Sequence, residues 1–232
     1  MRSLFLCILL GTIFSAAGQT VIGMTGEPAL GTLPWLVAGS NSYAGVYHFG
    51  VSEAESDLAL AVDGQMVTAQ IRSSEWVSRP EHFRSVYRTL SNVRIIGNKF
   101  YSAETNGEFI SVISEGKRVS GLKIYKPWSP SVGKNMAEVG VRVAAIDSYY
   151  AGRYPQASHT ILTAATITSY STEQANLMRN EIYARYGFRF TKPALVAYFK
   201  NQSWYQPEDV SIDKLLTEIE RKNIAALKAA TR

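Results

Sequence analysis

The sequence predicts an α+β protein, in which an antiparallel β-meander is followed by a small three-helix domain at residues 171–232. Two observations lead to this fold class. Between residues 43 and 128, apolar and polar residues alternate in short runs separated by turn residues, which is typical of sequential β-hairpins. From residue 171 onward, apolar residues recur at spacings of three and four, which is typical of amphipathic helices. The meander could be closed as a barrel or folded as a sandwich.

The clearest hairpin is expected around Asp63-Gly64. Residues 58–62 and 67–71 alternate on either side of this pair, and both turn residues tolerate the positive φ that a type I′ turn requires. Similar patterns surround Gly97-Asn98 and Gly116. Short hairpins in sequence order therefore predict an antiparallel β-rich domain over residues 43–128, whereas residues 19–42 are expected to form an irregular lead-in.

A low-charge stretch at residues 129–170 begins beside two closely spaced prolines, Pro127 and Pro130. Residues 139–146 and 161–167 could be additional strands of the sheet or parts of an ordered linker. Because proline-rich, weakly charged segments are typical of domain boundaries, we expect few contacts between the two halves of the chain.

Cap residues mark the helices of the C-terminal domain. Ser171 and Gln174 have the spacing of a capping box at the start of the first helix, and Gly187 stands where that helix would end. Two further helices are expected to begin at Thr191 and near Ser211, with an aromatic-rich loop between them.

Residues 1–18 are expected to be a secretory signal peptide. An apolar run from Leu4 to Phe14 follows Arg2, and small residues suited to signal peptidase come after it. The run is shorter than the ~20 apolar residues that a bilayer-spanning helix needs. The single cysteine, Cys7, lies within it, so the mature chain would contain neither a disulfide nor a thiolate. We therefore expect an exported bacterial protein, periplasmic or extracellular, with no membrane span in the mature chain.

Composition and motifs indicate few kinds of chemistry. The net charge of +5 is spread along the chain, whereas nucleic-acid-binding proteins concentrate basic residues on one face, so no nucleic-acid partner is expected. The three histidines lack the spacing of metal ligands, and no nucleotide-binding or nucleophile motif is present. Three closely spaced carboxylates are interpreted as part of a solvated turn: Glu53, Glu55 and Asp57. We accordingly predict no catalytic, metal-binding or cofactor-binding residue, and no cofactor.

The run LMRNEIYARYG at residues 177–187 resembles the signature of the YARHG domain family. Later elements of the C-terminal region resemble it too: Tyr198-Phe199, Trp204-Tyr205, Pro207, Glu220 and Asn223-Ile224. The resemblance covers about residues 172–228 and implies a small helical module of exported bacterial proteins, with no established activity. Tyr186 stands where the family has histidine, so a ligand or base role for that histidine does not carry over. The N-terminal β-region resembles no family.

Residues of this signature form the candidate site. They could build a recognition patch, or they could tie the loop at 201–209 to the first helix by burying aromatic rings and satisfying buried polar groups. The structural role is the favoured interpretation, with Trp204 packed under the helix that carries Arg185. The candidate residues are Arg179, Glu181, Tyr183, Arg185, Tyr186, Trp204 and Tyr205.

Three functions are compatible with these patterns. The favoured one is a non-catalytic envelope or extracellular module that binds a polymer or protein partner, which exposed aromatics on a side-chain-filled barrel would support. An envelope-acting hydrolase would need paired carboxylates facing one cleft. A carrier of a small apolar ligand would need a roomy barrel lumen, near whose mouth four residues are expected to lie: Phe83, Val86, Tyr87 and Leu90.

Overall fold

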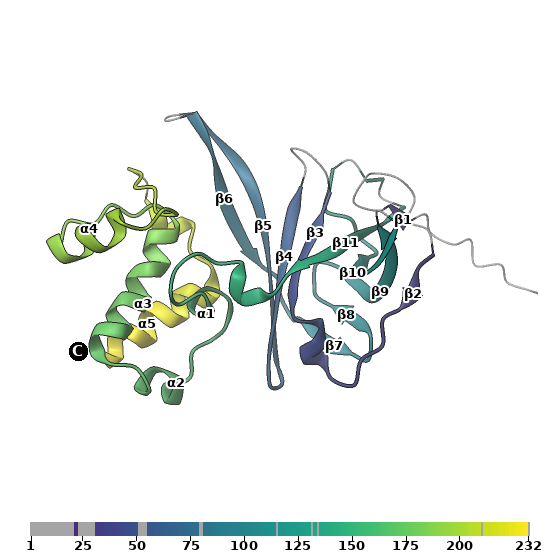
Figure 1. The fold of residues 1–232 in the computed structure, drawn as a ribbon, viewed down its shortest axis with the longest axis horizontal. Coiled ribbons are helices and arrows are strands. Elements are labelled where there is room, and N and C mark those ends of the chain that lie inside the picture. The colour runs from purple at the N-terminus through teal and green to yellow at the C-terminus, as the bar shows by residue number, and fades with distance from the viewer. Residues whose placement is uncertain are drawn as a thin grey trace, which may run out of the picture.

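The computed structural model describes residues 21–22, 31–50, 55–78, 81–114, 116–130, 132–133, 135–209 and 211–231. It contains a large antiparallel sheet region followed by helices, which confirms the predicted fold class. Figure 1 shows the helices gathered on one side of a long hairpin, with the rest of the sheet on the other side. The predicted signal peptide at residues 1–18 lies outside the described residues, as does Glu53.

Nine strands follow one another across the sheet in the order β6-β5-β4-β3-β11-β10-β9-β8-β7, and each neighbouring pair is antiparallel. Two short strands lie off this path, β1 parallel to β11 and β2 antiparallel to β9. The bounds are β1 Val21–Ile22, β2 Leu33–Pro34, β3 Gly45–Phe49, β4 Ser56–Asp63, β5 Met66–Ser78, β6 Glu81–Thr89, β7 Arg94–Ile96, β8 Lys99–Tyr101, β9 Asn106–Ser114, β10 Lys117–Ile124 and β11 Ala137–Ala144.

The predicted hairpin around Asp63-Gly64 joins β4 to β5. Val62 pairs with Val67 and Asp63 with Met66, and Gly64 has a φ of 58°, which a side chain would disfavour. The hairpin of β5 and β6 then extends this edge of the sheet, and Figure 1 shows it projecting beside the helices.

The low-charge stretch after residue 128 contributes to both halves of the molecule. Residues 137–144 form β11, which enters the middle of the sheet between β3 and β10. Residues 161–167, the second stretch that could have been a strand, instead lead into a short helix.

The sheet curls into a barrel-like form, because β7 at one end of the strand order comes back into contact with β5 near the other. Side chains fill its interior. Tyr43 stacks on Phe109 with ring centroids 4.0 Å apart, and Tyr47 and Phe100 also lie against Phe109. The buried interior set is Tyr43, Tyr47, Phe49, Leu58, Leu60, Ala69, Ile71, Leu90, Phe100, Phe109, Leu122 and Ile124.

The described residues of the C-terminal half contain five α-helices, whereas three were expected: α1 Gln156–His159, α2 Ala164–Thr168, α3 Thr172–Arg185, α4 Pro193–Lys200 and α5 Glu218–Ala230. The capping box of Ser171 and Gln174 is present at the start of α3. The last α-helix begins later than the expected position near Ser211, because a 3₁₀ turn at Ile212–Lys214 comes first. Thr217 is the N-cap residue of α5.

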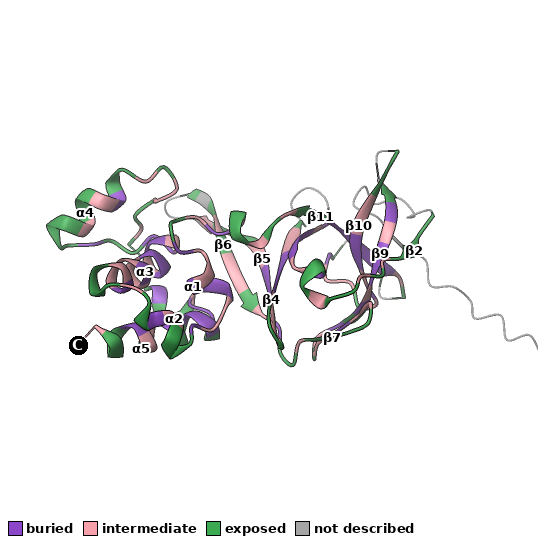
Figure 2. Ribbon diagram, turned by 60° about the horizontal axis from the view of Figure 1, so that its bottom comes forward, coloured by how far each residue is buried: buried purple, intermediate pink, exposed green. Residues whose placement is uncertain are grey.

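Figure 2 shows buried residues, in purple, on several helices of the C-terminal half. Met178 and Ile182 of α3 are fully buried and pack in one apolar cluster with Leu227 of α5 and with Tyr154 and Leu162 from the segments that hold α1. The helical half therefore has a core of its own.

The two halves meet through more contacts than the sequence led us to expect. Gln70 on β5 is only 1% exposed; its amide nitrogen donates to the Ser158 carbonyl at 2.8 Å, and its amide oxygen accepts from the Tyr150 hydroxyl. Tyr87 on β6 stacks on Tyr150 and meets the edge of Tyr186 on the helical side. These buried contacts fix the helical half against the β5–β6 hairpin.

Candidate functional site

Arg185, from the predicted signature, lies in a buried polar network at the end of α3. Its guanidinium donates to the carbonyls of Ala151 at 2.7 Å and Tyr154 at 3.0 Å, and to the Ser158 hydroxyl at 2.9 Å. It also lies 3.6 Å from the Glu181 carboxylate, one turn earlier on the same helix. The guanidinium thus holds the segment before α1 against α3.

Glu181 is fully buried and binds the same segment from the other side. Its carboxylate accepts hydrogen bonds from the backbone nitrogens of Arg153 at 3.0 Å and Tyr154 at 2.8 Å, and from the Tyr198 hydroxyl at 3.2 Å. These donors compensate for the loss of water around a buried charge.

Glu220 of α5 is a second buried carboxylate, next to the position where this chain departs from the family signature. It accepts from the hydroxyls of Tyr186 at 2.7 Å and Ser158 at 2.6 Å, and from the Thr217 backbone nitrogen at 2.9 Å. Burial raises the pKa of the Glu220 carboxyl above its ordinary value. Tyr186 therefore supplies a hydrogen-bond donor where the family has histidine.

The other candidate residues lie on separate surfaces. Arg179 and Tyr183 line a hollow of about 420 Å³ beside the 3₁₀ turn before α5. Tyr205 donates from its hydroxyl to the Phe188 carbonyl at 2.8 Å. The structure thus brings Glu181, Arg185 and Tyr186 together but places Arg179, Tyr183 and Tyr205 apart from them.

Trp204 is half-buried. It lies edge-on to Phe199 of α4 with ring centroids 6.0 Å apart, in a cluster that includes Ala184 of α3. It also lines a cavity together with Arg185 and Tyr186, so one of its sides faces space between the two halves of the molecule.

This cavity, of about 230 Å³, lies between the β5–β6 hairpin and the helices, and we call it the interdomain groove. Aromatic side chains and arginines predominate among its lining residues. These residues are Arg72, Phe83, Arg84, Ser85, Tyr87, Tyr149, Ala151, Ala184, Arg185, Tyr186, Gly187, Trp204, Gln206 and Glu208.

An exposed aromatic pair stands at the hairpin side of the groove. Phe83 is 61% exposed and Trp76 is 55% exposed, and their rings meet edge to face with centroids 5.0 Å apart. They are cross-strand partners in the register of β5 and β6. Large apolar side chains that remain exposed together on a folded domain are typical of binding surfaces.

The cations of the groove are neutralised within the protein. Every arginine that lines it has an acidic partner within 4 Å: Arg72 with Asp57, Arg84 with Glu75 and Glu208, and Arg185 with Glu181. Arg72 also lies over the ring of Tyr149, 4.3 Å from its centroid. The groove therefore presents aromatic faces and polar edges with little unbalanced charge.

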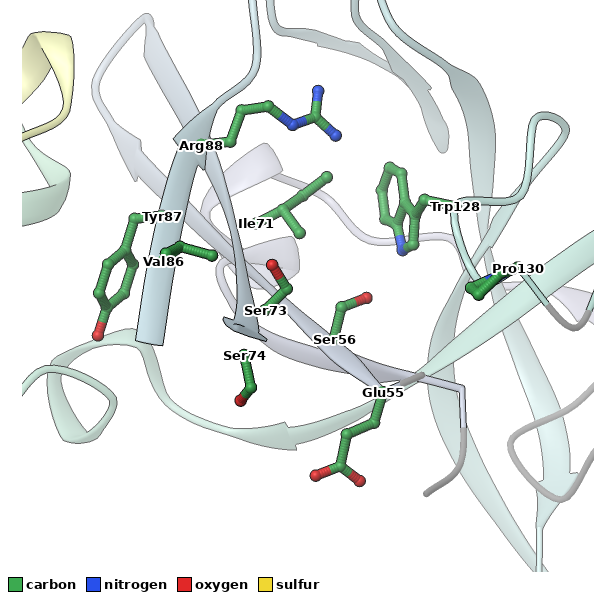
Figure 3. A pocket seen from close by; sticks show the side chains of 10 residues that line it. All are labelled: Glu55, Ser56, Ile71, Ser73, Ser74, Val86, Tyr87, Arg88, Trp128 and Pro130. Carbon is green, nitrogen blue, oxygen red and sulfur yellow. The ribbon is translucent and has the colours of Figure 1, made fainter. Parts of the chain in front are cut away.

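A second cavity, of about 450 Å³, opens at one mouth of the curled sheet, and we call it the barrel-mouth pocket. Figure 3 shows it between strand side chains, among them Ser56, Ile71 and Arg88, and the loop that holds Trp128, whereas Tyr87 points away from the cavity. Its lining residues are Glu55, Ser56, Ile71, Ser73, Ser74, Val86, Tyr87, Arg88, Trp128 and Pro130. Of the four residues expected near a barrel mouth, Val86 and Tyr87 are here, whereas Leu90 is in the packed interior and Phe83 lies in the groove.

Of the three closely spaced carboxylates in the sequence, the two in the described part of the chain, Glu55 and Asp57, lie beside the two ring nitrogens of His48. Asp57 accepts from Arg72 at 2.6 Å and lies 2.7 Å from His48 Nδ1, whereas Glu55 lines the barrel-mouth pocket and lies 3.7 Å from His48 Nε2. No cluster of three or more metal-ligating side chains occurs within the described part of the chain.

Several residues of these two cavities, and Trp76 of the aromatic pair beside the groove, were not predicted from the sequence. Trp76, Arg88 and Trp128 carried no motif, although an aromatic residue at an outward strand position or between two prolines is a weak signal for an exposed or loop-anchored ring. Tyr149 lay in the stretch that had no assigned structure. These residues come together only in the folded protein, because they lie on different strands and loops.

The YARHG domain family model matches residues 151–232, which confirms the resemblance of the C-terminal region. The match begins before α1 and so includes the segment that Arg185 and Glu181 bind. YARHG domains are typical of extracellular and periplasmic proteins. No curated protein and no solved structure matches the chain. Among the helices described, none has the length and apolar character needed to cross a bilayer.

Proposed function

We propose that this protein, whose residues 151–232 match the YARHG domain, is an exported non-catalytic module that binds a neutral glycan chain in the interdomain groove. The observation that carries this function is the exposed pair of Trp76 and Phe83 beside a groove whose arginines all have acidic partners.

The packed interior of the sheet supports binding at the outer surface over transport in a lumen. Twelve buried residues fill the space that a carrier would leave open, among them Tyr47, Phe49 and Phe109. A ligand of polymer length also needs an open groove, because a closed cavity cannot accommodate a chain that continues in both directions.

The chemistry of the groove favours a neutral, hydroxyl-rich ligand. A sugar ring has apolar C–H groups on its faces, which pack on aromatic rings such as Phe83 and Trp204, and hydroxyl groups at its edges, which bond to polar side chains. An anionic polymer would instead require cations without partners, and the arginines of the groove have acidic neighbours.

The test uses a β-linked hexamer of N-acetylglucosamine as the neutral glycan and isothermal titration calorimetry as the measurement. We expect Trp76→Ala and Phe83→Ala each to weaken binding about tenfold or more, because exposed aromatic residues at a binding surface often contribute most of the affinity. Binding by the native protein should persist in 1 M NaCl, since salt screens only charge-dependent attraction.

Ile96→Ala is the matched control, because Ile96 is 60% exposed on β7 and does not line the groove. It should bind the hexamer as the native protein does. Unchanged binding by Phe83→Ala and Trp76→Ala would contradict the function proposed, and so would complete loss of binding in high salt. Circular dichroism of each variant checks that the fold is retained.

A further inference from the structure

We propose that the barrel-mouth pocket is a second site, which shares only Tyr87 with the lining of the groove and binds a small monocarboxylate with an apolar body through Arg88 and Trp128. The cavity volume of about 450 Å³ is within the range of small-molecule sites. In Figure 3 the Arg88 side chain extends from its strand toward the side of the pocket where Trp128 lies, with Ile71 beneath it.

Arg88 is the cationic side chain that would bind the carboxylate of the ligand. It lies on β6 opposite Ile71 of β5, and within the described chain its guanidinium has no hydrogen bond or ion pair. The other arginines of this hairpin, Arg72 and Arg84, both have carboxylate partners. The planar guanidinium can bind a carboxylate through two parallel hydrogen bonds. Because Arg88 has no partner among the described residues, its donors are available for such a ligand.

Trp128 supplies a fixed aromatic wall whose indole N–H can report on binding. Its indole nitrogen is buried and has no acceptor among the described residues, a state that is uncommon for a buried polar atom. The loop is held in place because the buried Glu138 carboxylate accepts from the backbone nitrogens of Trp128 at 3.2 Å and Ser129 at 3.3 Å. Phe49 packs edge-on against the indole with ring centroids 4.9 Å apart.

The remaining lining explains the expected size and charge of the ligand. Ile71 and Val86 provide an apolar surface between the strands, and Ser56 and Ser73 present hydroxyl groups that bind no other described side chain. The pocket contains one cation, and Glu55 at its rim would repel a second negative charge. A monoanion with a short apolar chain therefore fits better than a phosphate or a dicarboxylate.

Hexanoate is the probe, and the indole N–H resonance of Trp128 in protein labelled with ¹⁵N-tryptophan is the measurement. Trp128→Phe assigns that resonance. We expect hexanoate to shift it with saturation, and hexanol, hexylamine and inorganic phosphate to bind at least tenfold more weakly. Arg88→Gln should weaken hexanoate binding about ten- to a hundredfold, because a hydrogen-bonded charge pair is lost.

Arg94→Gln is the matched control, since Arg94 is an exposed arginine on β7 that lies over Tyr101 and does not line the pocket. It should leave hexanoate binding unchanged, and so should Phe83→Ala, which separates this site from the groove. Three results would overturn the site: equal binding of hexanol, preferential binding of hexylamine at Glu55, or unaltered hexanoate binding by Arg88→Gln. Absence of any shift up to the solubility limit of hexanoate would also overturn it.

Discussion

At the scale of single residues, the helical half depends on two buried carboxylates, Glu181 and Glu220. A carboxylate removed from water is costly unless several donors surround it, and both have three or more hydrogen-bond contacts. Tyr186 is one donor to Glu220, so the residue at which this chain departs from the family signature is part of the buried network. The signature residues Glu181, Arg185 and Tyr186 therefore bind the chain to itself.

Tyr186→Phe tests this dependence. The substitution keeps the buried ring but removes the hydroxyl that donates to Glu220, so we expect the free energy of unfolding to fall by about 1–3 kcal/mol. Chemical denaturation at pH 7 measures the change. Tyr170→Phe is the control, because Tyr170 is only half-buried and its hydroxyl has one weak contact, at 3.3 Å from Gln156. Equal stability of the native protein and Tyr186→Phe would contradict the role assigned to the hydroxyl.

Sequence reasoning identified these residue types but not their partners. Arg185 could be placed on a helix from the spacing of its neighbours, whereas its acceptors at Ala151 and Tyr154 lie some thirty positions earlier in a stretch without periodicity. The groove and the barrel-mouth pocket were harder still to predict. Arg88 and Trp128 approach each other only because β6 and the loop after β10 border the same curled sheet.

At the scale of elements, two helices begin with the same capping box in different surroundings. The box of Ser171 and Gln174 is exposed at the start of α3, whereas the box of Thr217 and Glu220 at the start of α5 is buried. The Thr217 hydroxyl also accepts a hydrogen bond from Gln70 of β5, at 3.4 Å. The second cap therefore joins helix initiation to the contact between the two halves.

Thr217→Ala should consequently destabilise the protein more than Ser171→Ala does. Loss of an N-cap hydroxyl costs about 0.5–2 kcal/mol, and we expect Ser171→Ala to lie within this range. Thr217→Ala should cost about 1 kcal/mol more, because Glu220 and Gln70 each lose a partner in a buried site. Thr217→Ser retains the hydroxyl and should recover most of the loss. Equal destabilisation by the two alanine variants in thermal unfolding would show that the cap does not contribute to the interface.

At the scale of the whole molecule, local patterns predicted the hairpins and helices but not how the chain closes. The alternation around Asp63-Gly64 depends on neighbouring residues and was reliable. The position of β11 between β3 and β10 depends on pairing between strands distant in sequence, which local alternation does not encode. The buried contact of Gln70 with the helical half was not predicted either. Its partner Ser158 is distant in sequence, and a glutamine in a strand is usually expected to be exposed.

His159 lies at this contact and makes it sensitive to acid. It is 4% exposed and its ring lies tilted against that of Tyr150, with centroids 5.4 Å apart, while its backbone carbonyl accepts from Thr68 of β5 at 2.5 Å. The pKa of His159 is lowered to about 4, mainly by burial and in smaller part by the nearby Arg185 charge, whereas the Asp147 carboxylate at 4.0 Å acts in the opposite direction. The folded protein therefore holds this imidazole neutral at a pH where an exposed histidine is charged.

The stability of the protein should accordingly fall between about pH 6.5 and pH 4. Over this interval the unfolded chain binds a proton at His159 that the folded chain excludes, so the His159 contribution is fully present above pH 6.5 and lost as the pH falls toward 4. The difference between these pKa values corresponds to about 3 kcal/mol. The raised pKa of Glu220 acts in the opposite sense, because the folded state binds that proton more readily.

His159→Gln separates the two effects. This variant retains Glu220 but has no imidazole to protonate, so its unfolding free energy, measured with urea at pH 7 and at pH 4.5, should decrease less on acidification than that of the native protein. His48→Gln is the matched control, because His48 is half-buried on β3 and, within the described chain, its ring contacts the carboxylates of Asp57 and Glu55, not a residue of the helical half. If the unfolding free energy falls by the same amount in the native protein and in His159→Gln, protonation of His159 does not cause the loss of stability in acid.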